Sequence, residues 1–243
     1  MKMYAVLSDI HGNMNALEKV IEDMKQYVID GCILLGDLID YGMQSNEVVN
    51  HIENSLDVDI ICNIWGNHER AIMLNDYTRF SSSRGIESAK HTAKVLNDNT
   101  RKYLISSMIK EGIKEFMIGN KRCLAVHGSL EDNYWKSISP DNVRGDYSSY
   151  DIVFSGHSHY SHFFTKFYDA ENPHMRNKHA VRFINPGSVG QPRNHNPAAQ
   201  YALLDIDTMA VILKAVTYDV EAEMALYDGS LDDFYRIRLE RGI

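Results

Sequence analysis

The sequence predicts an α/β fold with a mostly parallel sheet, and three observations support this prediction. Short apolar runs at residues 4–7, 32–35 and 58–64 are continuous rather than alternating, which is typical of strands covered on both faces. Segments with apolar residues at helical spacing separate these runs. A strand–helix–strand order of this kind joins parallel strands through right-handed crossovers.

Two helices are expected between the first three strands. Residues 15–29 place apolar side chains such as Leu17 and Val20 on one helical face, and Asn13 is a good N-cap just before them. A second helix begins at Ser45 and again carries an apolar face.

Residues 70–111 differ from the part before them and predict a helical insertion beside the strand ends. Residues 86–96 and 101–109 have helical patterns, and Asn99 or Thr100 is expected to cap the second of these helices. The insertion is either a lid over a site or a piece of ordinary structural packing.

The chain after residue 113 predicts further strands. Gly119-Asn120 is a hairpin signal between two strand-like runs. The other expected strands and the two terminal helices lie at residues 162–168, 180–184, 201–206, 211–218, 220–226 and 231–239. No internal repeat or long linker interrupts the sequence, so a single domain over residues 1–243 is expected.

The composition argues against several classes of protein. The formal net charge is −8, whereas a dedicated nucleic-acid surface normally carries a positive excess. No apolar stretch is long enough to span a membrane and no secretory apolar segment follows Met1, so a cytoplasmic location is expected. Cys32, Cys62 and Cys123 fit no disulfide or zinc-finger spacing and are expected to be free and buried. An oligomer is compatible with the sequence.

Five strand-like runs end in short motifs that combine aspartate, asparagine or histidine with glycine. They are Asp9-x-His11, Gly36-Asp37, Gly66-Asn67-His68-Glu69, His127-Gly128 and Gly156-His157-x-His159. The carboxyl ends of strands in an open α/β sheet meet at one edge, so these side chains are expected to converge. Oxygen and imidazole ligands without a thiolate suit manganese, iron, zinc or a similar ion. The helix start at Asn13 also suits an anion.

The order of these motifs resembles that of the calcineurin-like metallophosphoesterases. More narrowly, the segments 8–13 (SDIHGN) and 185–193 (NPGSVGQPR) resemble a compact bacterial and archaeal phosphodiesterase branch related to diadenosine tetraphosphatases. The resemblance extends from Leu7 to about Val220. It implies a four-layer αββα sandwich with two divalent metal ions at the strand ends, manganese or iron, with zinc, nickel and magnesium as alternatives.

The resemblance also implies a role for each motif residue. One metal would be bound by Asp9, His11 and His159, the other by Asn67, His127 and His157, and both by Asp37. His68 would bind no metal and would protonate the leaving-group oxygen, because the reference pKa of histidine is close to neutrality. Asp40 matches the aspartate that orients this histidine in the protein phosphatase branch, with a surface or turn aspartate as the alternative.

Differences between this sequence and the protein Ser/Thr phosphatases reduce the range of candidate substrates. Those enzymes carry arginines where this chain has Tyr41 and Trp65, so two phosphate-binding cations are absent. Arg193 either supplies part of that contact or forms a surface ion pair. Tyr41 and Trp65 either stack on a base or aryl group or simply pack in the interior. Asn13, at its helix start, is a further candidate for substrate binding.

The sequence therefore predicts a dinuclear metal-dependent phosphoesterase that hydrolyses a small phosphodiester, phosphomonoester or dinucleoside polyphosphate. Two metals would clamp the phosphoryl oxygens and generate a bridging hydroxide for in-line attack. The alternatives are a protein Ser/Thr-type phosphatase, a nuclease of the same superfamily and a metal-binding scaffold without turnover. The acidic net charge argues against the nuclease, and the complete ligand set with His68 argues against the scaffold.

Overall fold

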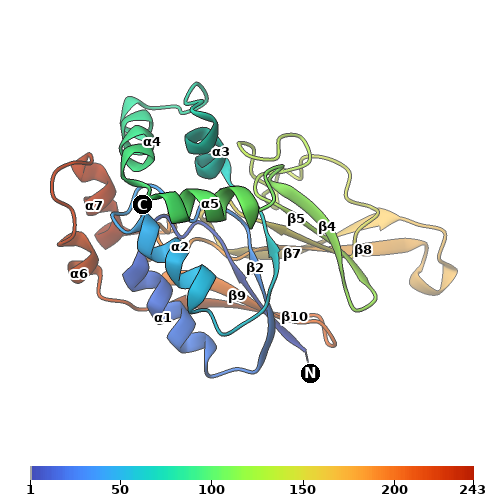
Figure 1. Cartoon of the computed structure of the whole chain (residues 1–243). Helices are drawn as coiled ribbons and strands as arrows, with labels where there is room; N and C mark the ends of the chain where they lie inside the picture. Colours follow the sequence, from blue (N-terminus) through green and yellow to red (C-terminus); the bar gives the residue numbers. More distant parts are fainter. Residues whose placement is uncertain (1) are drawn as a thin grey trace.

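The computed structural model describes residues 2–243 and contains two five-stranded sheets packed face to face (Figure 1). The first sheet has the strand order β10-β9-β1-β2-β3. Its strands are β1 (Met3–Leu7), β2 (Ile29–Leu34), β3 (Ile60–Asn63), β9 (Ala199–Asp205) and β10 (Ala210–Val216). Strands β1, β2 and β3 are parallel, whereas β9 pairs antiparallel with both β1 and β10.

The second sheet has the strand order β4-β5-β6-β8-β7. Its strands are β4 (Ile113–Ile118), β5 (Lys121–Val126), β6 (Ile152–Ser155), β7 (His162–Asp169) and β8 (Lys178–Asn185). Strands β5, β6 and β8 are parallel, and their hairpin partners β4 and β7 are antiparallel to them. The expected α/β fold is confirmed. The second sheet has a parallel centre with an antiparallel strand at each edge, whereas the first sheet is parallel from β1 to its edge strand β3 and has antiparallel pairing only at β9.

Helices cover the outer face of the first sheet. The crossover helices are α1 (Met14–Met24) and α2 (Ser45–Asn54), and their apolar faces form one core with that sheet. Near the chain end, α6 (Val220–Met224) lies against α1 and packs with α7 (Asp233–Arg241), as Figure 1 shows. Helix α1 ends five residues earlier than expected, because β2 already begins at Ile29.

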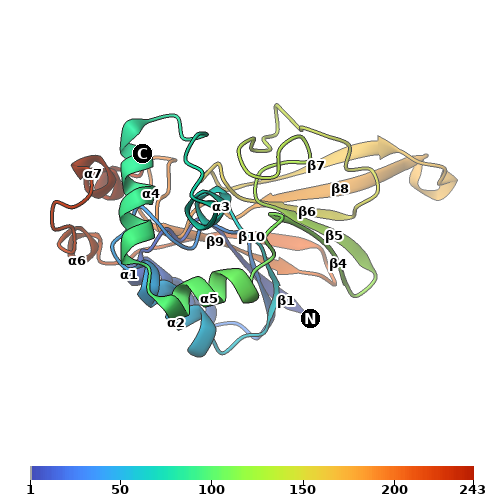
Figure 2. The ribbon, with the colours of Figure 1, turned by 45° about the horizontal axis from the view of Figure 1, so that its top comes forward.

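Alternation along the strands divides the interior into three cores. On β1, Leu7 faces the helices and Val6 faces the second sheet. On β5, Leu124 faces away from the first sheet and packs against Tyr147, which belongs to the irregular segment 127–151. The expected sandwich is therefore confirmed, with this irregular segment covering the second sheet where helices were expected (Figure 2).

Three helices lie between β3 and β4. They are α3 (Asn67–Leu74), α4 (Ser83–Val95) and α5 (Asp98–Ser106). Helix α3 was not expected and begins inside the Gly66-Asn67-His68-Glu69 motif. The expected cap of α5 was wrong, because Asn97 caps it by accepting a hydrogen bond of 2.8 Å from the Thr100 backbone N–H.

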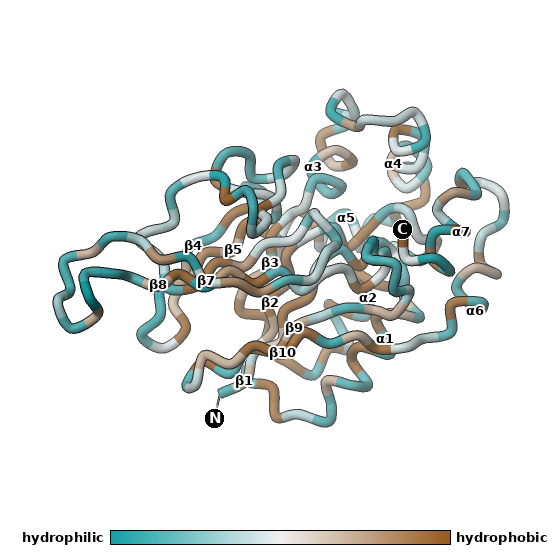
Figure 3. Tube along the Cα trace, turned by 180° about the vertical axis from the view of Figure 1, so that it is seen from behind, coloured by the Kyte–Doolittle hydropathy of each residue, from teal (hydrophilic) through white to brown (hydrophobic). Residues whose placement is uncertain are grey.

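Two further expectations concern burial and the membrane. The three cysteines are free and buried, as expected. Within residues 2–243, no helix is long and apolar enough to cross a membrane. Figure 3 shows hydrophobic residues along the strands of the body and hydrophilic ones toward the tip of the β7–β8 hairpin, which also contains a short 3₁₀ helix, Pro173–Met175.

Candidate metal centre

The five strand-end motifs meet at one edge of the sandwich and are joined through their backbones. The Asp9 N–H donates to Gly36 O at 3.0 Å, and the His11 N–H donates to Asp37 O at 2.9 Å. Within the second sheet, the Gly156 N–H donates to His127 O at 3.0 Å. Short loops after parallel strands therefore place these side chains at one edge, as the sequence predicted.

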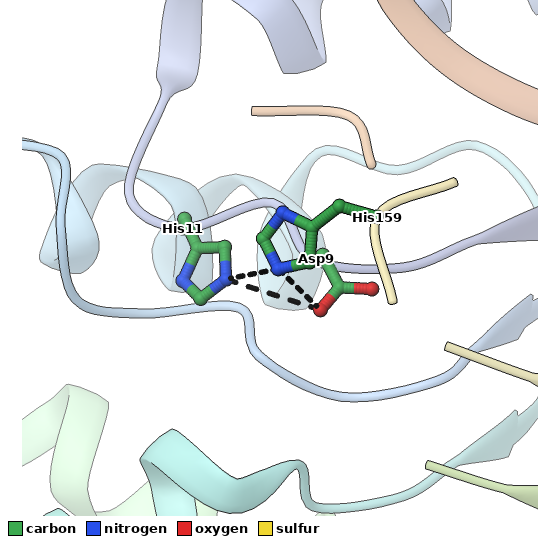
Figure 4. Close-up of side chains that lie close together, drawn as sticks. All are labelled: Asp9, His11 and His159. Atoms are coloured by element: carbon green, nitrogen blue, oxygen red, sulfur yellow. Dashed lines mark hydrogen bonds and ion pairs between the residues drawn. The ribbon is translucent and has the colours of Figure 1, made fainter. Parts of the chain in front are cut away.

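The first cluster consists of Asp9, His11 and His159 (Figure 4). The two histidine Nε2 atoms lie 3.3 Å apart, and Asp9 Oδ1 lies 3.2 Å from Nε2 of His159 and 3.9 Å from Nε2 of His11. All three residues are buried. Three ligand atoms from two distant parts of the chain therefore converge on one small volume.

The second cluster consists of Asp37, His127 and His157, with Asn67 between the histidines. His127 Nε2 lies 3.3 Å from Asp37 Oδ2 and 3.0 Å from Asn67 Oδ1, and His157 Nδ1 lies 2.9 Å from the same Asn67 oxygen. Asp37 Oδ2 is also 3.7 Å from His11 Nε2, in the first cluster. Asp37 is therefore the residue that connects the two clusters.

Backbone carbonyls fix the protonation of three of these histidines. Nδ1 of His11, His127 and His159 faces the carbonyl oxygens of Ile39, Leu35 and Gln191, at 3.2, 2.6 and 2.5 Å respectively. A carbonyl only accepts, so Nδ1 carries the proton and the Nε2 lone pair faces the cluster in the neutral ring.

The donor set fits divalent cations. In the first cluster, Asp9 Oδ1 is buried without a hydrogen-bond partner, because only Oδ2 is bound, by the Ser8 hydroxyl and the His157 N–H. Lone pairs that converge without protons between them suit a positive ion, and nitrogen and oxygen donors suit manganese, iron or zinc.

The pKa values of the histidines determine whether such an ion must displace a proton in order to bind. Burial lowers the pKa of His11 and His159 well below 6.5, which favours neutral rings with a free lone pair. Burial acts in the same direction on His127, but the Asp37 carboxylate outweighs it and raises the pKa of His127 to about 9. A cation at the second cluster would have to displace that proton.

His68 stands beside both clusters on α3. Its Nδ1 contacts Asp40 Oδ2 at 2.6 Å, and its Nε2 lies 4.0 Å from Asp37 Oδ2. Burial lowers the pKa of His68, but the Asp37 and Asp40 carboxylates outweigh burial and raise it above 6.5. His68 also forms a compact group with His11 and Asp37, so geometry alone allows it to be a ligand.

Three residues that hold Asp37 and Asp40 in place were not among the predicted site residues. Ser88 and Thr92 of α4 donate hydroxyl hydrogen bonds of 2.6 and 2.8 Å to Asp40 Oδ1. Glu69 is buried and accepts the N–H groups of Asp37, Leu38 and Gly66 at 2.7–2.8 Å. The only available signals were the position of Glu69 inside its motif and the spacing of four between Ser88 and Thr92, which places them on one helix face.

Several metal-cluster residues have left-handed backbone conformations. The φ angles are 54° for Asp9, 50° for His11, 53° for Asp37, 64° for His157 and 58° for His159. Such a conformation costs a non-glycine residue about 1–2 kcal/mol. Close backbone approach adds a demand for glycine at Gly66, where a Cβ atom would lie 2.1 Å from Asp37 Oδ1.

Comparison with known proteins identifies the family. A model described as the calcineurin-like phosphoesterase superfamily domain matches residues 1–209. The chain belongs to this superfamily. Membership places it among phosphoesterase hydrolases, and the two clusters are its candidate sites for divalent metals.

Three relatives of this superfamily member span nearly the whole chain. An uncharacterised protein of Methanocaldococcus jannaschii is 30% identical over 230 residues, which are 90% of this chain and 89% of that protein. The crystal structure of a metallophosphoesterase from Sphaerobacter thermophilus has a TM-score of 0.74 at 24% identity. A structure from Pyrococcus horikoshii has a TM-score of 0.80 at 24% identity. Each of the two solved structures matches 100% of this chain and 99% of its own.

A pocket of about 500 Å³ opens over the clusters of this superfamily member. Besides cluster residues and His68, it is lined by Tyr41, Arg79, Phe80, Ser81, Ser82, Gly85, Trp135, Lys136 and Arg193. Arg193 is half-buried, its Nε has no hydrogen-bond partner, and no carboxylate within residues 2–243 pairs with it. The surface ion pair that was the alternative for Arg193 is therefore not formed.

The other substrate candidates have different places. Tyr41 lines the pocket but is largely buried, stacked on Tyr235 with ring centroids 4.5 Å apart. Trp65 packs in the core and donates to Leu104 O at 2.7 Å. Asn13 caps α1, as expected, but is fully buried and donates to Gly190 O and Tyr218 OH. Because its polar atoms are used in this way, the structure does not support substrate binding by Asn13.

Proposed function

We propose that this chain is a dinuclear metal-dependent phosphoesterase that hydrolyses a small phosphodiester, phosphomonoester or dinucleoside polyphosphate. The observation that carries the proposal is the position of Asp37, whose carboxylate faces ligand atoms of both clusters at 3.3 and 3.7 Å. Such a shared carboxylate is the natural group to hold two cations next to each other. The pocket above it is of a size for a small molecule.

The ligand roles follow the clusters. Asp9, His11 and His159 would hold one metal, Asn67, His127 and His157 would hold the other, and Asp37 would bind both. Two divalent ions, manganese or iron with zinc, nickel or magnesium as alternatives, would neutralise phosphoryl charge and lower the pKa of the attacking water. The chain itself contributes the fixed imidazole orientations and a largely buried floor for the pocket.

Proton transfer is the role of His68. The Asp40 carboxylate accepts the Nδ1–H of His68 and orients the ring, which leaves Nε2 toward Asp37 and the pocket. Ser88 and Thr92 hold Asp40 through its other oxygen. A histidine kept protonated by two carboxylates can donate a proton to the leaving-group oxygen.

The alternatives have less support. A scaffold without turnover would not require the His68–Asp40 pair beside a full set of ligands. A nuclease normally carries a basic tract, whereas this chain has a net charge of −8. A protein Ser/Thr phosphatase would require phosphate-binding cations where this chain has Tyr41 and Trp65, and Trp65 is packed in the core.

The test is hydrolysis by protein purified with Mn²⁺. The substrates are bis-p-nitrophenyl phosphate, p-nitrophenyl phosphate, diadenosine tetraphosphate and single-stranded DNA. We expect metal-dependent turnover of at least one small substrate, lost in Asp37→Ala and retained in the matched control Asp98→Asn, whose side chain is exposed on α5. Turnover of DNA alone would favour the nuclease. The absence of any turnover that depends on Asp37 would refute the proposal that the chain is an enzyme.

A further inference from the structure

Two aromatic side chains line the pocket next to His68. Phe80, in the connection between α3 and α4, meets the His68 ring edge to face with centroids 5.1 Å apart. Trp135, from the irregular segment 127–151, meets Phe80 at 5.3 Å and His157 at 6.2 Å. The rings of His68, Phe80, Trp135 and His157 therefore form a continuous aromatic wall that begins and ends beside the metal clusters.

A single carboxylate holds this aromatic wall in place. Asp132 Oδ1 accepts the Trp135 backbone N–H at 3.2 Å, and Asp132 Oδ2 binds the Arg79 guanidinium at 2.7 Å. That guanidinium also lies 5.4 Å from the centre of the Trp135 ring. Because Phe80 directly follows Arg79, two chain segments more than 50 residues apart are fixed together. Half-buried rings held in this way are preorganised for a ligand.

The two flanks of the pocket have different chemistry. The aromatic wall is on the side of His68, which the proposed function makes the proton donor to the leaving oxygen. Arg193 lies two residues after Gln191, whose carbonyl accepts the Nδ1–H of His159, so this cation is on the side of the first cluster. The leaving group therefore meets two aromatic rings, one of them next to Arg79, and the part that stays behind meets Arg193.

We propose that the leaving group carries a planar aromatic ring, aryl or nucleobase, which stacks against Phe80 and Trp135 while Arg193 contacts the phosphoryl group that remains. This rests on the proposed function. In the reaction, water attacks phosphorus, the P–O bond to the ring-bearing alcohol breaks, and His68 gives its proton to the leaving oxygen. The proton released from water restores the histidine. Stacking is tolerant of ring identity, since every base and aryl group has a π-face.

Two matched substrate pairs test the proposal with the Mn²⁺-loaded protein. Methyl phenyl phosphate is compared with methyl hexafluoro-2-propyl phosphate, whose alkyl leaving group, hexafluoro-2-propanol, has an acidity similar to that of phenol. Adenosine 5′-(methyl phosphate) is compared with the 5-(methyl phosphate) of methyl β-ribofuranoside, which keeps the ribose hydroxyls and lacks the base, and the released alcohol is identified by chromatography. We expect kcat/KM to be about 10-fold higher for the aromatic member of at least one pair. The two pairs separate an aryl from a nucleobase preference.

Variants decide whether the aromatic wall causes that preference. Trp135→Leu and Phe80→Leu should reduce it to less than about 3-fold, while Trp135→Phe should retain it and Phe167→Leu, an exposed aromatic outside the pocket, should not alter it. Turnover of both pairs without aromatic preference, an equal loss on both members in the variants, or release of methanol would overturn the proposal and leave the proposed function standing. If none of these diesters is hydrolysed while p-nitrophenyl phosphate or diadenosine tetraphosphate is, this proposal fails and the proposed function stands; if none of the small substrates is hydrolysed, both fail.

Discussion

The floor of the pocket and its aromatic wall are built in different ways. The floor consists of buried ligands on short loops after parallel strands, joined by backbone hydrogen bonds such as that from Asp9 to Gly36. The wall consists of half-buried side chains, Phe80 and Trp135, in two irregular connections held together by Asp132. The difference teaches that the sheets determine which reaction is possible, whereas the connections determine which molecule undergoes it.

The largest expected effect comes from the residue that contacts both regions. His68 lies beside Asp37 in the floor and Phe80 in the wall. For His68→Asn we expect kcat to fall about 10²–10⁴-fold for esters of poorly acidic alcohols, because general acid catalysis is lost, and far less for p-nitrophenyl esters. Metal content, measured by inductively coupled plasma mass spectrometry, should stay at the wild-type value. Loss of metal would instead identify His68 as a ligand.

A smaller decrease in kcat is expected from α4, which contacts the pocket floor through Asp40. Ser88→Ala combined with Thr92→Val removes both hydroxyl donors to Asp40 while keeping the volume nearly constant. We expect kcat to fall by up to about 30-fold for poorly acidic leaving groups, with KM and metal content unchanged, since each of the two hydrogen bonds contributes about 1 kcal/mol.

Ser83→Ala, with an exposed side chain on the same helix, is the control for the α4 variants. An equal decrease in kcat for all leaving groups would mean that Ser88 and Thr92 contribute only to packing. In that case the helical connection would not influence catalysis at the pocket floor, despite its hydrogen bonds to Asp40.

The smallest effect lies outside both regions and concerns stability. Burial raises the pKa of Glu223 to about 7 from an ordinary 4.5, and its Oε1 has no hydrogen-bond partner. A raised carboxyl pKa gives stability that is present below pH 4.5 and is lost as the pH rises through 7. The free energy of unfolding should therefore decrease by ~3 kcal/mol between pH 4.5 and 8 through this one group.

Glu223→Gln should remove that decrease, as measured by urea denaturation of metal-free protein at several pH values. Glu221→Gln, exposed on the same helix, should behave like the wild type. Activity at pH 7 should not change in either variant, because neither residue lines the pocket. A decrease in the free energy of unfolding as large in Glu223→Gln as in the wild type would contradict the assignment.

The parts of the molecule that were predictable from sequence are those with a local signal. The ligand motifs were found because each follows a continuous apolar run, and strand ends converge by topology alone. Helix α3 was missed because its first residues, Asn67 and His68, also form the end of a strand motif. Phe80 and Trp135 carried no signal, since their contact joins two irregular segments and follows no periodicity.

The left-handed residues at the metal clusters connect function with evolutionary change. Asp9, His11, Asp37, His157 and His159 each hold a backbone conformation that glycine adopts without cost. A lineage released from catalysis can therefore gain stability by losing the very residues that bind metal. Such a chain would change toward a more stable protein that has lost its metal ligands and its activity.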